Sequence, residues 1–215
     1  MKPDSLVFDL DGTLWDTCDA CAVAWNIVLA REGTSYREIT GDDVRKVTGR
    51  SHEDCIRLTF PDFEEPVLQR LITETMTEDV LQINRLGGEL YPGVADGLRA
   101  LKERHRLFIV SNCQSGYIEM FLEMSGLGEL FEDFECWGNT GEPKSENLRR
   151  VIERNSLQSP VMVGDTPGDQ SAAIANEIPF AFVEYGFQTC HAPDQSFASF
   201  GDLVEFYLAH MEEPR

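Results

Sequence analysis

The sequence predicts an α/β fold, in which a doubly wound parallel sheet carries an all-helical module inserted after its first strand. Short and nearly continuous apolar runs recur along the chain, as is typical of strands buried on both faces of a parallel sheet. Amphipathic helical patterns alternate with these runs, which indicates strand–helix–strand units. Between residues 16 and 87 this alternation stops, and helical patterns follow one another without a convincing strand.

The predicted strands are short apolar runs bounded by polar or turn-forming residues. Five segments fit this description: 5–10, 106–111, 133–137, 160–164 and 179–184. Helical periodicity fills the intervals between them. Val94, Leu98 and Leu101 recur at i, i+4 and i+7, and a charged helical segment over 143–155 begins at Pro143. A last helix would align five apolar side chains: Phe200, Leu203, Val204, Tyr207 and Met211.

The interval 16–87 is interpreted as an inserted all-helical domain, with 1–15 and 88–215 as the core domain. Thr40 and Ser51 fit helix N-caps. A longer helix would carry an apolar stripe: Leu68, Leu71, Ile72, Met76, Val80 and Ile83. An interval of roughly 70 residues is far longer than one crossover between parallel strands requires. The alternative is a set of helices packed on one sheet.

The composition excludes several classes of partner. The 215 residues include 18 Lys+Arg and 38 Asp+Glu, so the net charge is 18 − 38 = −20. Such a surface repels nucleic acid and anionic membranes, and neither is expected as a partner. No apolar run approaches the roughly 20 residues of a membrane span. The first residues lack the apolar stretch of a secretory signal, so a cytoplasmic location is expected.

The cysteines are expected to be reduced thiols rather than a disulfide framework or a metal site. Six of them are scattered through periodic segments of the chain. Cys18 and Cys21 have the spacing of a redox or metal pair, but a second pair with metal-ligand spacing is missing from the sequence.

Polar side chains follow four of the predicted strands. In chain order these are Asp9 and Asp11, then Ser111 and Asn112, then Lys144, and finally Asp165 and Asp169. Because ligands of open parallel sheets bind beyond the carboxyl ends of the strands, these side chains are candidates for one common site.

The carboxylates of this set predict a magnesium site. Two carboxylates about 4 Å apart repel each other by roughly 4 kcal/mol at an effective dielectric constant near 20. Asp9 and Asp165, at the ends of neighbouring strands, would face this repulsion. Mg²⁺ would remove it, because this ion prefers oxygen ligands and is usually held by carboxylates together with a substrate phosphate. A His or Cys cluster that would favour zinc is missing from the sequence.

The remaining polar groups fit a phosphate. Ser111 and Asn112 end a strand before a helix, where a hydroxyl and backbone N–H groups can bind an anion. Lys144 would add a positive charge for the phosphate oxygens. Gly12 lets the chain turn, so that Asp11 would approach the ligand of Asp9 from the flank. One carboxylate could then attack phosphorus while the other transfers protons.

Four short motifs resemble the signatures of the haloacid dehalogenase-like hydrolase superfamily. The run Asp9-Leu10-Asp11-Gly12-Thr13-Leu14 resembles the first signature. Ser111-Asn112, Lys144 and Gly164-Asp165-x₃-Asp169 resemble the second, third and fourth, in the same order. The resemblance extends from residue 5 to about residue 185. The helical insertion resembles the cap of the phosphoglycolate phosphatase and β-phosphoglucomutase branch.

This resemblance implies a role for each motif residue. Asp9 would be the nucleophile and Asp11 the acid/base, and Thr13 would orient the loop. Magnesium would be held by four residues: Asp9, Asp11 through its backbone carbonyl, Asp165 and Asp169. The phosphate would be held by Gly12, Ser111, Asn112 and Lys144.

The cap is expected to select the substrate. Residues 46–54 resemble the cap loop that faces the site in relatives. Arg50 and Ser51 are the candidates there, with Lys46 and His52 less favoured. The alternative for this loop is a turn at Gly49 and a helix cap at Ser51, with solvated charges.

A Mg²⁺-dependent phosphatase acting on a small phosphorylated metabolite is the predicted function. A dehalogenase attacks carbon and needs neither a metal nor a second aspartate, so Asp11 disfavours it. The sugar phosphomutases of the branch carry a cap histidine where this chain has Cys21, with Trp25 following, which disfavours a mutase. A non-catalytic relative that binds phosphorylated ligands or a partner protein is disfavoured by the presence of both Asp9 and Asp11.

Overall fold

A six-stranded parallel sheet forms the centre of the larger part of the molecule. The computed structural model describes residues 3–33 and 36–209. The strands are, in spatial order, β5 (Phe131–Cys136), β4 (Arg106–Ser111), β1 (Ser5–Phe8), β6 (Pro160–Gly164), β7 (Phe180–Val183) and β8 (Gln195–Phe197). Every neighbouring pair is parallel. The predicted doubly wound α/β fold is therefore confirmed.

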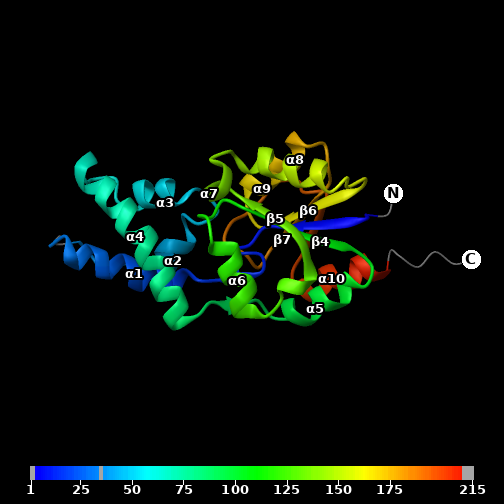
Figure 1. Ribbon diagram of the computed structural model, residues 1–215, viewed down its shortest axis with the longest axis horizontal. Coiled ribbons are helices and arrows are strands. Elements are labelled where there is room, and N and C mark those ends of the chain that lie inside the picture. The colour runs from blue at the N-terminus through cyan, green and yellow to red at the C-terminus, as the bar shows by residue number, and fades with distance from the viewer. Residues whose placement is uncertain (1–2, 34–35, 210–215) are drawn as a thin grey trace, which may run out of the picture.

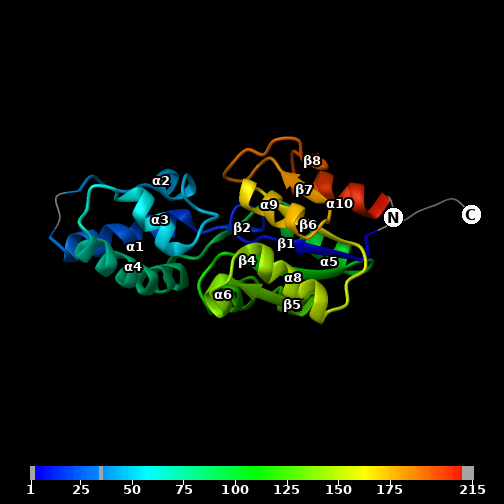
Figure 2. The same cartoon turned by 90° about the horizontal axis from the view of Figure 1, so that it is seen from above.

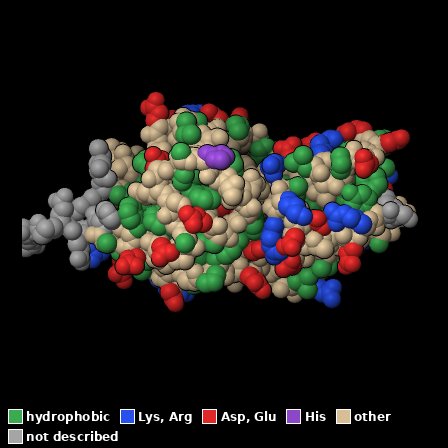
Figure 3. Space-filling view, turned by 180° about the vertical axis from the view of Figure 1, so that it is seen from behind, with side chains coloured by type: hydrophobic (Ala, Val, Ile, Leu, Met, Phe, Trp, Pro, Cys, Tyr) green, Lys and Arg blue, Asp and Glu red, His purple; other side chains and the backbone are tan. Residues whose placement is uncertain are grey.

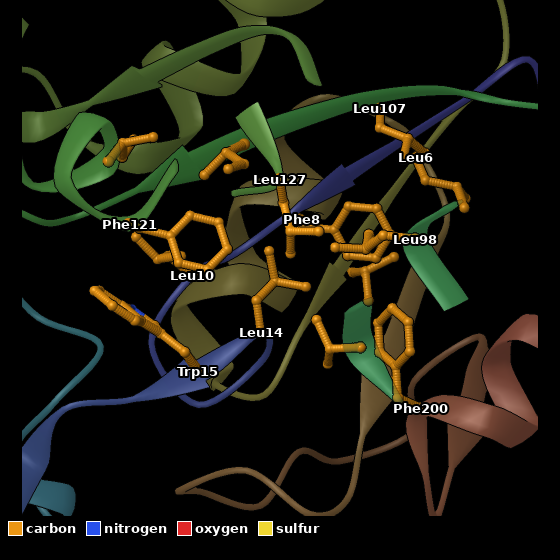
Figure 4. Packing of buried hydrophobic residues seen from close by; sticks show 14 of the residues in the cluster. Leu6, Phe8, Leu10, Leu14, Trp15, Leu98, Leu107, Phe121, Leu127 and Phe200 are labelled. Carbon is orange, nitrogen blue, oxygen red and sulfur yellow. The ribbon is translucent and has the colours of Figure 1, made fainter. Parts of the chain in front are cut away.

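Helices cover both faces of this sheet (Figure 1). On one face lie α5 (Val94–Lys102), α6 (Tyr117–Ser125) and α10 (Phe200–Ala209), and on the other lie α8 (Lys144–Arg154) and α9 (Pro167–Ala175). After Ser5, strand β1 is apolar at every position, because successive side chains point to opposite faces and both faces are covered. Leu6 and Phe8 belong to the hydrophobic cluster on the face covered by α5, α6 and α10, part of which Figure 4 shows. Val7 belongs to the hydrophobic cluster on the opposite face, with α8 and α9. Two short helices flank β5: η1 (Gly128–Leu130) and α7 (Trp137–Thr140).

The observed strands differ from the predicted ones mainly at their ends. The strands over 106–111 and 160–164 are as predicted. The first strand ends at Phe8, because the carbonyl of Leu10 already accepts turn hydrogen bonds from the following residues. Strand β5 begins earlier than expected, at Phe131, and β8 was not expected at all. In α10, Phe200, Leu203 and Tyr207 are buried, whereas Val204 is half-buried and Met211 lies outside the described residues.

Four helices follow one another beyond the carboxyl end of β1. They are α1 (Cys18–Arg31), α2 (Gly41–Arg45), α3 (His52–Thr59) and α4 (Glu65–Leu86). Thr40 and Ser51 are the N-cap residues of α2 and α3, as predicted. The chain enters and leaves these helices through the antiparallel pair β2 (Trp15–Asp16) and β3 (Glu89–Leu90). The expectation that the interval lacks a strand is therefore wrong at Asp16, since a two-residue strand has no periodicity of its own.

The four helices have a hydrophobic cluster of their own, which is distinct from the two clusters that flank the sheet. Trp25 and Phe60 lie at its centre, with ring centroids 6.1 Å apart. The buried face of α4 is only partly apolar, because it includes Thr75 and Asp79. Met76 and Val80, which were predicted to lie in its apolar stripe, are half-buried. Figure 2 shows these helices to one side of the sheet.

The surface carries mixed charges. On the face shown in Figure 3, most Lys and Arg side chains lie over helices α1 to α4, on the right of the picture, and are interleaved with acidic side chains. Arg45 is an example, since its guanidinium pairs with Asp16, Asp19 and Asp42. Within residues 3–33 and 36–209, every helix is too short or too polar to cross a membrane.

Candidate active site

Three buried carboxyl groups meet at the carboxyl ends of β1 and β6. Asp9 directly follows β1, Asp165 directly follows β6, and Asp169 lies in the first turn of α9. Each offers an oxygen within 4.8 Å of the oxygens of the other two, and all three residues are at most 2% exposed. The pairing of β1 with β6 explains this meeting, because the N–H of Asp9 still donates to the carbonyl of Val163 at 2.8 Å.

Local geometry holds two of these carboxylates in place. The Thr166 N–H donates to Asp169 Oδ2 at 2.9 Å and the Asp169 N–H donates to Thr166 Oγ1 at 3.3 Å, which forms the capping box of α9. The Thr166 hydroxyl also donates to Asp169 Oδ2, at 2.7 Å. Asp165 Oδ1 accepts from the Thr13 hydroxyl at 3.2 Å, and its Oδ2 accepts from the Phe187 N–H at 2.7 Å. Asp169 therefore caps a helix with one oxygen and leaves the other for the site.

Gly12 permits the close packing around Asp165. Its φ is +87°, a backbone conformation that residues other than glycine rarely adopt. A Cβ atom at this position would lie 2.3 Å from Asp165 Oδ2. A larger residue would therefore displace a carboxylate of the cluster.

Lys144 is the positive charge of the cluster. It begins α8, is 5% exposed, and its Nζ donates to Asp9 Oδ1 and Asp169 Oδ1, both at 2.6 Å. Burial alone lowers the pKa of Lys144, but the charges of Asp169 and Asp9 raise it above its usual value. The ammonium group expected to hold phosphate is thus also the counter-charge of two carboxylates.

The cluster is still short of positive charge. Three carboxylates and one ammonium leave a formal charge of −3 + 1 = −2 in a buried space. Burial and the nearby charge of Asp169 raise the pKa of Asp9 to about 7, and burial with Asp169 and Asp9 raises the pKa of Asp165. A buried set of oxygen donors with excess negative charge fits a hard divalent cation such as Mg²⁺.

Removing the ammonium group should destabilise the metal-free protein. In Lys144→Met, Asp9 and Asp169 would stay buried without a cation, which we expect to lower the free energy of unfolding by about 3–5 kcal/mol. Urea denaturation in the presence of a chelator measures this loss. The matched control is Lys102→Met, because Lys102 is 29% exposed and pairs with Glu132 at the surface, where a pair contributes about 1 kcal/mol or less. Equal losses in the two variants would contradict the role of Lys144 as counter-charge.

Asp11 lies beside the cluster and has a different partner. Its Oδ1 accepts a hydrogen bond from the Tyr117 hydroxyl at 2.7 Å, and that hydroxyl also lies 2.7 Å from Thr17 Oγ1. Burial raises the pKa of Asp11 to about 6, although the hydrogen bond from Tyr117 opposes this shift. Tyr117 was not among the predicted site residues, and its one local signal is its place at the start of the helix after Ser111-Asn112.

Ser111 and Asn112 reach the same cavity but are engaged differently. Ser111 ends β4 and is buried, and its Oγ accepts from the Cys113 N–H at 3.2 Å. Asn112 donates its side-chain amide to the carbonyl of Gly49 at 2.9 Å. The Asn112 side chain therefore contacts the helical interval between residues 16 and 87.

The loop over residues 46–54 lies above the strand ends. Besides the contact from Asn112, Gln188 Nε2 donates to the carbonyl of Thr48 at 2.9 Å. Arg50 lines the cavity from its exposed rim, where its guanidinium also donates to Val47 O at 3.0 Å. Ser51 caps α3 by accepting from the Asp54 N–H, and it lines a neighbouring groove instead. Lys46 is exposed and pairs with Asp43, whereas His52 is mostly buried and lines the cavity.

A cavity of about 70 Å³ lies between the strand ends and the four helices. Asp9, Asp11 and Lys144 line it from the sheet side. The lining from the helices includes Cys18, Cys21, Trp25, His52 and Asp79. Cys18 and Cys21 are free thiols, as expected. Cys21, which stands where the sugar phosphomutases carry a cap histidine, lines the wall of the cavity. The arrangement can hold a small anion beside the ammonium group of Lys144 and the carboxyl group of Asp9.

Comparison with known proteins gives one consistent result. The model of a family described as haloacid dehalogenase-like hydrolase matches residues 6–183. A phosphoglycolate phosphatase of Agrobacterium fabrum is 28% identical over 197 residues, which cover 84% of this chain and 80% of that protein. A phosphoglycolate phosphatase of Colwellia psychrerythraea is 27% identical over 222 residues, which cover 94% and 96%.

Solved structures share the fold at lower identity. A haloacid dehalogenase-like family hydrolase from Streptococcus pneumoniae superposes with a TM-score of 0.82 at 16% identity, covering 98% of this chain and 99% of its own. A protein from Clostridium acetobutylicum described as a predicted phosphatase has a TM-score of 0.82 at 19% identity, covering 97% and 100%. At these identities the likeness concerns the fold alone.

Proposed function

Because this chain belongs to the haloacid dehalogenase-like hydrolase family, we propose that it is a Mg²⁺-dependent phosphatase that hydrolyses a small phosphate monoester through an aspartyl-phosphate. The observation that carries the proposal is the buried group of Asp9, Asp165, Asp169 and Lys144, of which Asp9 and Lys144 line the cavity. The names of the relatives support the phosphatase reaction, since several of them are phosphoglycolate phosphatases. The free thiols of the described cysteines support the expected cytoplasmic location.

The first half of the reaction would use both carboxyl groups of the first motif. A carboxylate oxygen of Asp9 attacks phosphorus, and the bond between phosphorus and the ester oxygen breaks. Asp11 donates its proton to the departing oxygen. Its raised pKa suits a group that must carry a proton near neutral pH. The product alcohol leaves, and the phosphoryl group remains on Asp9.

The second half would regenerate the enzyme. Asp11, now ionised, takes a proton from a water molecule whose oxygen attacks phosphorus, and the bond between phosphorus and Asp9 breaks. Lys144 and the backbone N–H groups after Ser111 would bind the phosphoryl oxygens throughout. A bound Mg²⁺, held by Asp9, Asp165 and Asp169 with the Asp11 carbonyl, would neutralise charge on the phosphoryl group.

We also propose that residues 16–87 act as a cap on a core formed by residues 1–15 and 88–215. The cap has its own hydrophobic cluster, and it contacts the core through the loop around Gly49. A cap at this place would exclude bulk water during phosphoryl transfer and would contact the alcohol part of the substrate.

Phosphate release from a panel of small phosphate monoesters tests this function. We expect Mg²⁺-dependent release from p-nitrophenyl phosphate and from at least one small alkyl phosphate, and loss of that release when a chelator is added. The measurement is inorganic phosphate against time for each compound. A folded protein that releases phosphate from none of them would contradict the proposal.

A further inference from the structure

One buried carboxyl group in the cavity has no role in the reaction described above. Asp79 lies near the middle of α4, its side chain is 5% exposed, and it lines the cavity from the cap side. Within residues 3–33 and 36–209 its Oδ1 has no hydrogen-bond partner. Its Oδ2 accepts a long hydrogen bond from Trp25 Nε1 at 3.5 Å and lies 3.4 Å from His52 Nδ1, and the neutral Cys21 thiol is a further hydrogen-bond partner of the carboxyl group.

His52 does not supply a counter-charge to Asp79. The Thr75 hydroxyl donates to the carbonyl of Leu71 at 2.6 Å, so His52 Nε2, 2.9 Å away, must donate its own hydrogen to Thr75 Oγ1. The hydrogen of a neutral ring is then on Nε2, and Nδ1 presents a lone pair toward Asp79. Burial lowers the pKa of His52 to about 4, so the ring is neutral near pH 7.

The neighbouring residue on the same helix shows what a satisfied carboxylate looks like here. Glu78 is also buried, yet its two oxygens accept from Arg31 Nη1 and from Gln82 Nε2, both at 2.7 Å. Among the described ion pairs, Asp79 has none with Lys or Arg. Burial raises the pKa of Asp79, and the charges of Asp11 and Glu78 add to this. An unpaired carboxyl group in an apolar wall is costly, which points to a partner that arrives with the ligand.

We propose that Asp79 binds a protonated amine at the non-phosphate end of the substrate, so that this enzyme prefers small phosphorylated amines. An ammonium group donates charge-assisted hydrogen bonds to both carboxylate oxygens and neutralises the buried charge at once. The cavity of about 70 Å³ favours a small substrate. A carboxylate at the same end, as in phosphoglycolate, would give Asp79 no positive partner. This inference rests on the proposed phosphatase function.

A matched set of substrates tests the preference in the wild-type protein. The set contains alkyl phosphates of two to four carbons that end in an amine, a hydroxyl or a carboxylate, and kcat/KM is measured for each with Mg²⁺. At the best chain length we expect the amine to exceed the hydroxyl and the carboxylate by tenfold or more. A hydroxyl or carboxylate compound that equals or exceeds the amine at every length would overturn the proposal.

The isosteric variant Asp79→Asn tests the residue. We expect the ratio of kcat/KM for the amine to that for the hydroxyl of equal length to fall about 10–100-fold, the range for losing a charge-assisted hydrogen bond. The matched control is Glu78→Gln, which removes a buried carboxylate from the same helix outside the cavity and should leave the ratio unchanged. If Asp79→Asn lowered kcat/KM by one common factor for all substrates, the role of Asp79 would be structural instead.

Binding of phosphonates tests the amine site separately from the proposed phosphatase function. A phosphonate has a carbon–phosphorus bond in place of the ester bond, so the proposed reaction would not cleave it and its binding can be measured alone. Calorimetric titration with 2-aminoethylphosphonate and with phosphonoacetate, each with Mg²⁺, compares the two end groups directly. Tighter binding of the aminophosphonate, lost in Asp79→Asn, supports the amine site even if no ester is hydrolysed. Hydrolysis of esters without any preference between the phosphonates would overturn the amine site and leave the phosphatase reaction standing.

Discussion

Asp9→Asn is expected to reduce the steady-state phosphatase rate by roughly 10⁴-fold or more, since an amide cannot attack phosphorus in place of a carboxylate. Asp9 follows the central strand β1 and forms part of the cavity floor. The substitution keeps the shape of the side chain. It also removes one of three clustered negative charges, so the fold should persist.

Two measurements check this result. The first is the initial rate of phosphate release with Mg²⁺, and the second is mass spectrometry of acid-quenched protein, which detects phosphoryl transfer to Asp9 in the wild type. The matched control is Asp19→Asn, because Asp19 is exposed on α1 outside the cavity and its loss should leave the rate unchanged. Wild-type turnover by Asp9→Asn would show that another group is the nucleophile.

Removal of divalent cations is expected to abolish turnover and to lower the melting temperature by about 5–10 °C. The carboxylates of Asp9, Asp165 and Asp169 carry more negative charge than the ammonium group of Lys144 neutralises, so they still repel one another without a metal cation. A ligand at 100 times its dissociation constant stabilises the folded state by about 2.7 kcal/mol, and 1 kcal/mol corresponds to about 2–4 °C in a protein of this size. Thermal unfolding with excess Mg²⁺ and with a chelator gives the shift without any activity assay.

Asp165→Asn should lose this stabilisation by Mg²⁺. The asparagine can keep the hydrogen bond from the Phe187 N–H through its carbonyl oxygen, while its amide donates to Thr13. The metal-free variant should therefore be at least as stable as the metal-free wild type, because one buried charge has gone. If Mg²⁺ raised the melting temperature of Asp165→Asn as much as that of the wild type, the ion would bind elsewhere.

The buried strands and the residues at their ends could be predicted from the local sequence. Strands β4 and β6 are apolar at nearly every position because helices cover both of their faces, and that pattern is visible without a structure. Asp9 and Asp165 directly follow such strands, so the rule that parallel strands end at one edge predicted their meeting. Neighbouring residues along the chain carry this information.

Short and edge elements could not be predicted in the same way. Strand β8 has three residues, of which one is buried, and it exists because its backbone pairs with β7. Strands β2 and β3 have two residues each and pair across the whole helical interval. A segment of this length has too few side chains for a periodic pattern, so its conformation depends on a partner that is distant in the sequence.

Residue types and their order along the chain by themselves determined the doubly wound sheet, the place of the run of helices after its first strand and the identity of the acidic and basic residues at the strand ends. Tertiary structure alone decided that Tyr117 holds Asp11 and that Lys144 lies between Asp9 and Asp169. It also decided that Asp79 lines the cavity with one oxygen, Oδ1, that has no hydrogen-bond partner among the described residues. The physical reason is that periodicity and strand-end position are properties of adjacent residues. Hydrogen bonds and charge balance in a buried site depend instead on side chains that only the packing of distant segments brings within reach.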